Sequence, residues 1–327
     1  MHRRLLLSAG LACAAFGTIP LFSAAARAND SPARLVVPFP PGGGGDVLAR
    51  SVSQEFGAAF GRKILIENRP GAGGTVGARF ASNLPADGNS LLYVTNGILC
   101  VNPLLYANIP FDPLVSLAPV GQISSIGLMA VLNPNAIAGV NDLESLLKYA
   151  KANPDVVDYA SSGNGTTSHL AGCFLAERTG LKLSHVPYRS GAAAILDVLA
   201  GRVPLMIDVA PNVIHHVRAG KLAALGVASA TRLGIAPEVP TFAELGIDGF
   251  ELAAWDGVMA PAGTPESVLE KMSVALQRAL KEKSVVDRLR AKGAEPASGE
   301  RSDFSAFIGK ERPKWASLVK QIGAKTD

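Results

Sequence analysis

Apolar residues recur every three to four positions directly after a glycine-rich loop near the start of the chain. The spacing predicts a helix over residues 46–60 with one apolar face. The residues on that face are Val47, Leu48, Val52, Phe56, Ala59 and Phe60. Asp46 is a residue type that caps such a helix, and Gly61 is expected to end it. With a β-branched pair at 36–37 before the loop and "KILIE" (63–67) after the helix, the pattern predicts one unit of a parallel sheet.

The same succession of apolar runs and Gly- or Pro-rich loops continues along the chain. Strands are expected at 91–95, 119–123, 128–132, 157–160, 185–188, 204–208 and 222–228, and an extended stretch at 250–258. Helices are expected from about 75 to 81, and at 143–150, 170–175, 192–199, 213–219, 265–280 and 302–321. Asn141 with Glu144 resembles a capping box, and Thr264 is expected to cap a helix with Pro265 at its first position. Strands that alternate with helices predict an α/β fold.

The N-terminus has the pattern of a secretory signal peptide. Arg3 and Arg4 precede an apolar run that ends at Ala26-Arg27-Ala28, so we expect cleavage before Asn29 and an exported, soluble product, by the general or the twin-arginine route. The three arginines of this segment account for three of the four excess positive charges of the chain, which argues against a nucleic-acid partner. No later run is long enough to span a membrane.

The remaining chain, about 300 residues, is near the upper size for one core, so two lobes are expected. Only Cys100 and Cys173 remain after processing. They can pair or stay free as small buried groups, and the second reading is favoured.

The glycine-rich loop does not match a nucleotide cradle. A P-loop requires Lys and Ser or Thr directly after its glycines, whereas Asp46 and Val47 stand here. The third glycine of a dinucleotide fingerprint is also missing, although Glu67 has roughly the offset of a ribose ligand. No G-x-S-x-G motif is present, and Ser168 and His169, as neighbours on one helical turn, point apart. Metal-ligand spacings are absent, so no cofactor or metal is expected.

Two strand, loop and helix units remain as candidates for anion recognition. The loops Pro40–Asp46 and Gly163–His169 each direct helix-start N–H groups to the carboxyl edge of a sheet, where ligands of α/β proteins bind. Structural explanations stay open for individual residues. Asp46, Thr167 and Ser168 can cap helices, His169 can be structural, Tyr188 can belong to a cleft wall or to the core, and Arg189 can be a ligand cation or a solvated side chain.

The chain resembles the exported receptors of the tripartite tricarboxylate transporter family, also called Bug receptors, over nearly its whole mature length. The blocks that carry the resemblance include "VPFPPGGGGDVLAR" (37–50), "IENRPGAGGTVGA" (66–78), "NPLLY" (102–106), "PFDP" (110–113), "YASSGNGTTSHLAG" (159–172), "HVPYRSGAAAILDVLAGRV" (185–203), "VRAGKLAALGVAS" (217–229), "VPTFAELG" (239–246) and "APAGTP" (260–265). Ten such blocks, with "PADG" (85–88) among them, occur in the family's order.

This resemblance implies a type II periplasmic binding-protein fold, with two α/β lobes joined by two crossover strands and a ligand cleft between them. The first lobe would comprise residues 29–122 and 229–327, and the second residues 123–228. The ligand-binding residues implied by the resemblance are Phe39, Pro41, Gly42, Gly43, Gly44, Asp46, Thr95, Asn96, Gly97, Gly163, Asn164, Gly165, Thr166, Thr167, Ser168, His169, Tyr188 and Asp208. The chain departs from the family pattern at "TNGILC" (95–100), "MIDVAPNVIHH" (206–216) and Asp256, where an aromatic residue is usual.

The sequence therefore predicts a periplasmic, non-enzymatic, monomeric receptor that binds a small organic carboxylate and presents it to membrane permease subunits. A nucleotide- or dinucleotide-binding enzyme, and a sensory module that docks on a membrane receptor, are the alternatives.

Overall fold

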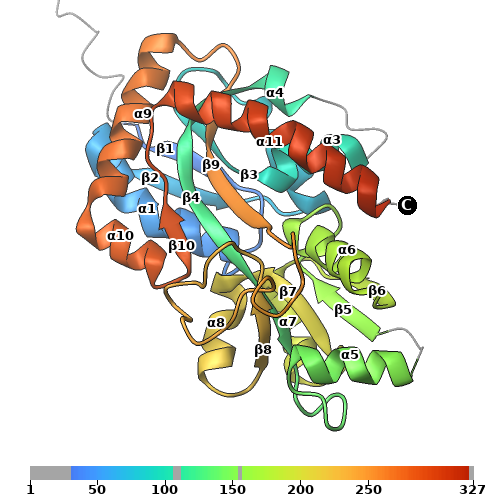
Figure 1. Cartoon of the computed structure of the whole chain (residues 1–327). Coiled ribbons are helices and arrows are strands. Elements are labelled where there is room, and N and C mark those ends of the chain that lie inside the picture. Colours follow the sequence, from blue (N-terminus) through green and yellow to red (C-terminus); the bar gives the residue numbers. More distant parts are fainter. Residues whose placement is uncertain (1–30, 106–111, 154–156, 324–327) are drawn as a thin grey trace, which may run out of the picture. The chain divides into compact units, whose positions relative to one another are not determined.

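The computed structural model describes residues 31–105, 112–153 and 157–323 (Figure 1). The predicted signal peptide lies outside these residues, as do parts of the 102–106 and 110–113 blocks. The described chain is an α/β structure with one ten-stranded sheet, whose main path runs in the order β2-β1-β3-β9-β4-β7-β5-β6.

The N-terminal strands form the predicted parallel unit. Strand β1 (Ala33–Val37) lies between β2 (Ile64–Asn68) and β3 (Ser90–Thr95) and is parallel to both. The crossovers are α1 (Gly44–Phe60) and α2 (Thr75–Ser82), each following a glycine-rich loop. This arrangement confirms the strand, loop and helix succession expected from the apolar pattern.

One long strand links this group to the rest of the sheet. Strand β4 (Leu117–Leu132) was expected as two extended stretches, but it is continuous over 16 residues. Its first part pairs antiparallel with β9 (Ala253–Pro261) and β10 (Ala294–Pro296), and β9 in turn pairs with β3. Ser124, Ser125 and Gly127, which lie between the two expected stretches, do not interrupt the strand because each of them pairs with a residue of β9.

The second part of β4 carries another group of strands. It pairs antiparallel with β7 (Leu205–Val209) and β8 (Ala223–Val227). Strand β5 (Val157–Ser161) is parallel to β7 and to β6 (Leu183–Pro187). The helices of this group are α5 (Leu143–Ala152), α6 (Thr167–Thr179), α7 (Gly191–Leu199) and α8 (Ala210–Arg218), in the lower half of Figure 1.

The C-terminal helices cover the first group of strands. Helix α9 (Glu266–Lys281) packs on α1 and β4, α10 (Lys283–Arg290) on α1 and α9, and α11 (Arg301–Ile322) on β4 and α6. Figure 1 shows α9 and α10 on one side of the sheet and α11 crossing the other. Short helices α3 (Asn102–Leu105) and α4 (Pro113–Ser116) complete this part, with a π-helical turn over Gly97–Val101.

Side chains of β4 alternate between two hydrophobic cores. Leu128, Ala130 and Leu132 join the larger core, which extends over both groups of strands, whereas Met129 and Val131 join a smaller core under α7 and α8. Because successive side chains of a strand point to opposite faces, one strand can contribute to both cores. Burial of apolar surface, at roughly 25 cal/mol per Å², therefore stabilises both sides of the sheet at this strand.

The starts of helices α1 and α5 differ from the sequence prediction. Helix α1 begins at Gly44, with Gly43 as its cap, so Asp46 lies inside the first turn. The capping box of α5 is formed by Asp142 and Ser145. Before α5 two polar residues, Asn141 and Asp142, precede the apolar run, and the spacing of that run does not tell which one adopts the extended cap conformation.

The cap of α9 is also displaced. Pro265 occupies the cap position of α9, and the Thr264 hydroxyl donates to the Pro261 carbonyl. Gly61 ends α1 in a left-handed conformation, as expected.

Cys100 and Cys173 are free, which confirms the favoured reading. Among the described residues, no helix combines the length and the apolar character needed to cross a membrane. The predicted boundaries of two lobes stay a prediction.

Candidate functional site

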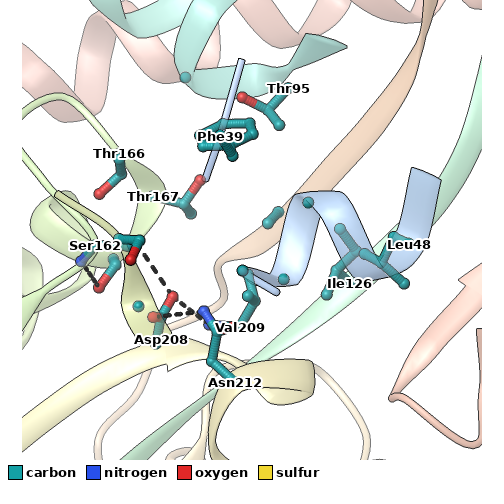
Figure 2. Close-up of a pocket in the computed structure, with 18 of the residues that line it drawn as sticks. Phe39, Leu48, Thr95, Ile126, Ser162, Thr166, Thr167, Asp208, Val209 and Asn212 are labelled. Atoms are coloured by element: carbon teal, nitrogen blue, oxygen red, sulfur yellow. Dashed lines mark hydrogen bonds between the residues drawn. The ribbon is translucent and has the colours of Figure 1, made fainter. Parts of the chain in front are cut away.

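A pocket opens where the first turns of several helices meet the carboxyl ends of the strands. Its walls come from both groups of strands (Figure 2). The residues that line it are Phe39, Gly43, Gly44, Gly45, Leu48, Gly73, Tyr93, Thr95, Asn96, Gly97, Ile126, Ser162, Thr166, Thr167, Ser168, Ser190, Gly191, Asp208, Val209, Asn212, Ala254 and Trp255. The cavity volume is about 80 Å³.

Four helix N-termini contribute to this lining. They are Gly43–Gly45 of α1, Thr166–Ser168 of α6, Ser190 and Gly191 of α7, and Val209 and Asn212 of α8. No side chain caps α1, so the N–H groups of its first turn keep their hydrogen-bonding capacity. A helix N-terminus carries about half a positive charge. The helix N-termini therefore contribute positive potential to the pocket, and its lining contains no lysine or arginine.

The first glycine loop is held rigidly from outside the pocket. Gly42 has a left-handed backbone (φ 78°), and its N–H donates to the Asp46 carboxylate at 2.9 Å. Asp46 also accepts hydrogen bonds from Arg50 and Asn68. Burial acts to raise the pKa of Asp46, but these hydrogen bonds outweigh it and hold the pKa below its ordinary value. Asp46 thus folds the loop back onto α1 and does not face the pocket.

The second loop is fixed by hydroxyl groups. Thr166 caps α6, since its side chain accepts from the His169 N–H, so the cap is neither Thr167 nor Ser168. The Ser168 hydroxyl donates to the Ile207 carbonyl and thereby links α6 to β7. Thr167 lies opposite Asn96 at the end of β3, and their side chains are hydrogen-bonded at 2.9 and 3.1 Å.

Glycines allow the two walls to approach closely. A Cβ added to Gly73 would lie 2.6 Å from the Asn164 carbonyl oxygen, closer than any side chain tolerates. A Cβ on Gly44 would lie 3.1 Å from both the Asn212 Oδ1 and a Val209 methyl group. The loops before α1 and α2 therefore touch the second group of strands through bare backbone.

Asp208 is the one carboxylate in the lining. Only 1% of its surface is exposed, and its side chain accepts from the Val209 N–H at 2.8 Å, from Asn212 Nδ2 at 2.8 Å and from the Ser162 hydroxyl at 3.4 Å. Figure 2 shows the three side chains together on one wall. Burial raises the pKa of Asp208 to about 6, against the opposing effect of these hydrogen bonds.

An aromatic wall closes the first side of the pocket. Phe39 packs edge-on against Tyr93, with ring centroids 6.3 Å apart. The Tyr93 hydroxyl donates to the buried Asp256 carboxylate at 2.5 Å, and Ser124 donates to the same carboxylate at 2.7 Å. Burial raises the pKa of Asp256 to about 6 in spite of these bonds. Asp256 therefore fixes the wall from behind and does not itself line the pocket.

An adjoining pocket, here called the mouth, shares Phe39, Gly73 and Ser162 with the first pocket and contains Tyr188 and Arg189. Both lie beside Gly163, Asn164 and the 70–74 loop. The Tyr188 hydroxyl donates to Asp197 at 2.7 Å, which directs the tyrosine side chain away from the inner pocket. Arg189 is exposed and is the one cationic residue lining this mouth.

His169 has a structural environment. It is buried, its Nδ1 accepts from the Gly165 N–H at 3.3 Å, and its ring stacks on His185 with centroids 4.1 Å apart. Burial lowers the pKa of both histidines to about 4. The neutral imidazole of His169 therefore holds the second loop through its hydrogen bond from the Gly165 N–H.

Most of the predicted site residues come together. The inner lining includes Phe39, Gly43, Gly44, Thr95, Asn96, Gly97, Thr166, Thr167, Ser168 and Asp208, and the mouth includes Phe39, Gly163, Asn164 and Tyr188. Pro41, Gly42, Asp46, Gly165 and His169 lie outside both linings.

Sequence reasoning missed the contributions of Ser162, Ser190, Gly191 and Asn212. Ser162 and Asn212 belong to segments that the sequence analysis singled out, and Ser190 with Gly191 has the form of a helix cap after a strand. A survey of every helix that begins directly after a strand of the sheet would have found Ser190, Gly191 and Asn212. No cluster of three potential metal ligands occurs in the described chain.

The family model for the tripartite tricarboxylate transporter family receptor matches residues 48–324. The chain belongs to this receptor family. Its members are substrate-binding proteins, and the pocket of this receptor, with neutral donors and no catalytic pair, agrees with that class. An enzyme that uses the glycine loop for a dinucleotide is thereby set aside.

Solved structures support the same assignment. The periplasmic binding protein BugD is 33% identical over 90% of this chain and 99% of its own, with a TM-score of 0.84. R. palustris Rpa4515, solved with adipate, is 32% identical over 89% and 97% of the two chains, with a TM-score of 0.85. MatC from Rhodopseudomonas palustris, with bound malate, is 28% identical over 88% and 98%, with a TM-score of 0.82. The similarity confirms the predicted periplasmic binding-protein fold.

Proposed function

We propose that this receptor resides in the periplasm, binds a small organic carboxylate in the pocket and delivers it to the membrane permease of a tripartite tricarboxylate-type transporter. The observation that carries the proposal is the convergence of four helix N-termini on a pocket whose lining contains no lysine or arginine. Each such terminus stabilises an anion by about 0.3–1 kcal/mol, and more where water is excluded.

The geometry indicates how a carboxylate would be held. The N–H groups of Gly44 and Gly45, together with the hydroxyl group of Thr95, offer neutral donors in the lining of the cavity. Phe39 and Trp255 supply apolar surface for the carbon skeleton. The lining as a whole includes residues from both groups of strands, so a ligand between them would favour an arrangement in which the two walls stay together.

The relatives support the ligand class and the compartment. One neighbour was solved with adipate and another with malate, and BugD is named a periplasmic binding protein. Delivery to a permease rests on the family's description as a transporter receptor.

A thermal-shift screen tests the binding proposal. We expect at least one di- or tricarboxylate, aromatic acid or acidic amino acid to raise the Tm of the mature chain, and its uncharged amide to have no effect. Isothermal titration then gives the affinity and stoichiometry. Tight binding of a sugar or a cation, with no response to any carboxylate, would refute the proposal.

Uptake measurements test the delivery step. Cells that lack this receptor are expected to lose uptake of the identified carboxylate, and the intact gene is expected to restore it. A variant that binds no ligand serves as the negative control. Unchanged high-affinity uptake in the deletion strain would contradict a role in transport.

A further inference from the structure

A glutamate stands in the apolar stripe of helix α11. Phe304, Ile308, Glu311 and Trp315 recur every three to four residues and are all buried, so they share one face of the helix. Glu311 is 7% exposed. A buried carboxylate loses its hydration, and replacing a buried ion by an apolar residue of similar volume is often neutral or stabilising. The stability of the helix alone therefore does not account for a glutamate at this position.

Both tryptophans of the chain donate to this carboxylate. Trp255 Nε1, from β9, and Trp315 Nε1, from α11, each lie 2.9 Å from Glu311 Oε2. Lys314 Nζ donates to Glu311 Oε1 at 2.8 Å. Because an indole carries a single N–H donor, its hydrogen bond to Glu311 sets the direction in which the Trp255 ring points.

Trp255 separates the ligand pocket from a second cavity. It lines the ligand pocket, and it also lines a cavity of about 370 Å³ on the α11 side, together with Phe307, Glu311 and Trp315. Phe304 and Phe307 contact the Trp255 ring edge-on, with ring centroids 5.9 and 5.3 Å away. The second cavity leaves the indole space to turn away from the ligand pocket, so its hydrogen bond to Glu311 is needed to hold it in place.

We propose that Glu311 is a positioning residue for ligand binding, which holds the Trp255 indole as a fixed wall of the ligand pocket. The inference rests on the proposed function. It extends the residues on which binding depends to α11, since Glu311 itself does not line the pocket. A wall that is fixed before the ligand arrives needs no ordering when the ligand binds, and this preorganisation raises the affinity.

A merely structural role for Glu311 predicts a different pattern. If Glu311 only satisfied the two indoles, its loss would lower the Tm, and the molecules that stay folded would bind ligand as before. A positioning role predicts a lower ligand affinity in protein that is fully folded. Affinity measured well below the Tm, with the Tm measured separately, distinguishes the two roles.

Substitutions of Glu311 test the proposal on the mature chain. Titration calorimetry uses whichever of succinate, malate, adipate, citrate, glutamate and benzoate binds the wild type most tightly. Glu311→Met keeps the length of the side chain but has no oxygen acceptor. We expect its affinity to fall by about tenfold, because the indole adopts the binding orientation in fewer molecules.

A conservative substitution tests for rescue. Glu311→Gln keeps an oxygen acceptor for the indoles and is expected to bind within about threefold of the wild type. If Glu311→Met does not fold, Glu311→Asp replaces it. Its carboxylate is one methylene further from the indoles, and a loss of affinity in the same direction is expected.

Trp315→Phe is the matched control and gives a spectroscopic readout. Trp315 is also buried and donates to the same oxygen, but it does not line the ligand pocket, so this variant is expected to keep the wild-type affinity. Trp255 is then the one tryptophan left in the chain. Its near-ultraviolet circular dichroism is expected to weaken when Glu311→Met is added and to persist when Glu311→Gln is added, because a ring that turns has no fixed environment.

The outcomes separate this inference from the proposed function. Wild-type affinity in folded Glu311→Met, an equal loss in Glu311→Gln or in Trp315→Phe, or an unchanged Trp255 spectrum would overturn the role of Glu311 while leaving a carboxylate receptor intact. Failure of every carboxylate of the series to bind the wild type would overturn both.

Discussion

Asn96 and Thr167 form a buried hydrogen-bonded pair that joins the two walls of the pocket. Asn96 follows β3 and Thr167 opens α6, 71 residues later, and both side chains lie in the lining. The Asn96 Oδ1 also accepts from the Trp255 N–H at 3.4 Å, so the pair is anchored to β9. The arrangement of the two walls in this structure is therefore stabilised by contacts between side chains of the receptor itself.

Thr167→Val is expected to destabilise the closed pocket. The substitution preserves the side-chain shape but leaves the buried Asn96 amide without its partner, which costs about 1–3 kcal/mol. We expect a lower Tm in the absence of ligand and a ligand affinity reduced by roughly tenfold, since fewer molecules occupy the binding-competent state. Thr166→Val is a comparison variant that loses the α6 cap instead. Unchanged affinity in Thr167→Val would contradict the role of this pair.

Gly43→Leu is expected to abolish ligand binding with little change in Tm. Gly43 has an extended backbone (φ −73°, ψ 162°) that other residues adopt, and the nearest atom to an added Cβ is the Pro40 carbonyl oxygen at 3.3 Å. The larger side chain would then occupy the cavity beside the α1 N-terminus. Calorimetry of ligand binding and a melting curve measure the two effects separately.

Gly234→Leu provides the matched control for that substitution. Gly234 is exposed, has no atom within 4 Å of an added Cβ and does not line the pocket. Both variants are expected to melt close to the wild type, and only Gly43→Leu is expected to lose ligand binding. Full affinity in Gly43→Leu would remove the first glycine loop from the binding site.

The stacked histidines predict an acid-dependent loss of stability. Their pKa of about 4 lies below the ordinary value of 6.5, so the unfolded chain binds protons that the native chain does not as the pH falls from about 6.5 to 4. Their contribution is complete above pH 6.5 and declines by up to about 1.4 kcal/mol per histidine per pH unit within that window. Asp208 and Asp256 act in the opposite direction, because their raised pKa values favour the native chain on acidification from pH 6 to 4.

The substitution His169→Gln separates the contribution of this histidine to the pH dependence of stability from that of the carboxylates. The Tm difference between wild type and variant is expected to be larger at pH 7 than at pH 5, by several degrees, since the wild type alone gains from the neutral buried ring at pH 7. Melting curves of both proteins in the same buffers give the comparison. A constant difference across this range would show that His169 does not titrate as its burial requires.

The two cysteines are expected to react only after unfolding. Cys100 is buried, and burial, assisted by the charge of Glu311, raises the pKa of its thiol to about 12, while burial also raises the pKa of Cys173. Thiolate is the reactive form, so the native mature chain should react slowly with a thiol reagent and the denatured chain should yield two equivalents. An unchanged Tm under reducing conditions checks the same point. Fewer than two thiols without reductant would indicate a disulfide.

The sequence predicted local elements well because their causes are local. The apolar spacing of residues 46–60 and the left-handed Gly61 define α1 almost to its ends. Strand neighbours had no such signal, since β3 pairs with β9 about 160 residues later, and only the tertiary fold brings them together. Cap positions were misassigned where consecutive polar residues, such as Asn141 and Asp142, compete for one site.

The candidate site was predicted in part for the same reason. The two loops before α1 and α6 were expected to converge, because both follow strands at the carboxyl edge of the sheet. Asn212 and Gly191 were not expected there, since their place depends on how α7 and α8 turn back onto β7. Asp46 was open to two readings, a helix cap or a ligand contact; in the structure it lies inside the first turn of α1, outside the pocket lining, and accepts from the Gly42 N–H.

The pairing of β3 with β9 has a consequence for how the chain is made. Strand β9 (253–261) pairs with the edge of β3 that faces β4 in the finished sheet. The N-terminal strands therefore cannot complete their sheet until these residues have been synthesised. Pairings of such long sequence separation form slowly, because the loop must close before the contacts contribute. The strand order itself therefore delays completion of the sheet until most of the chain has been synthesised.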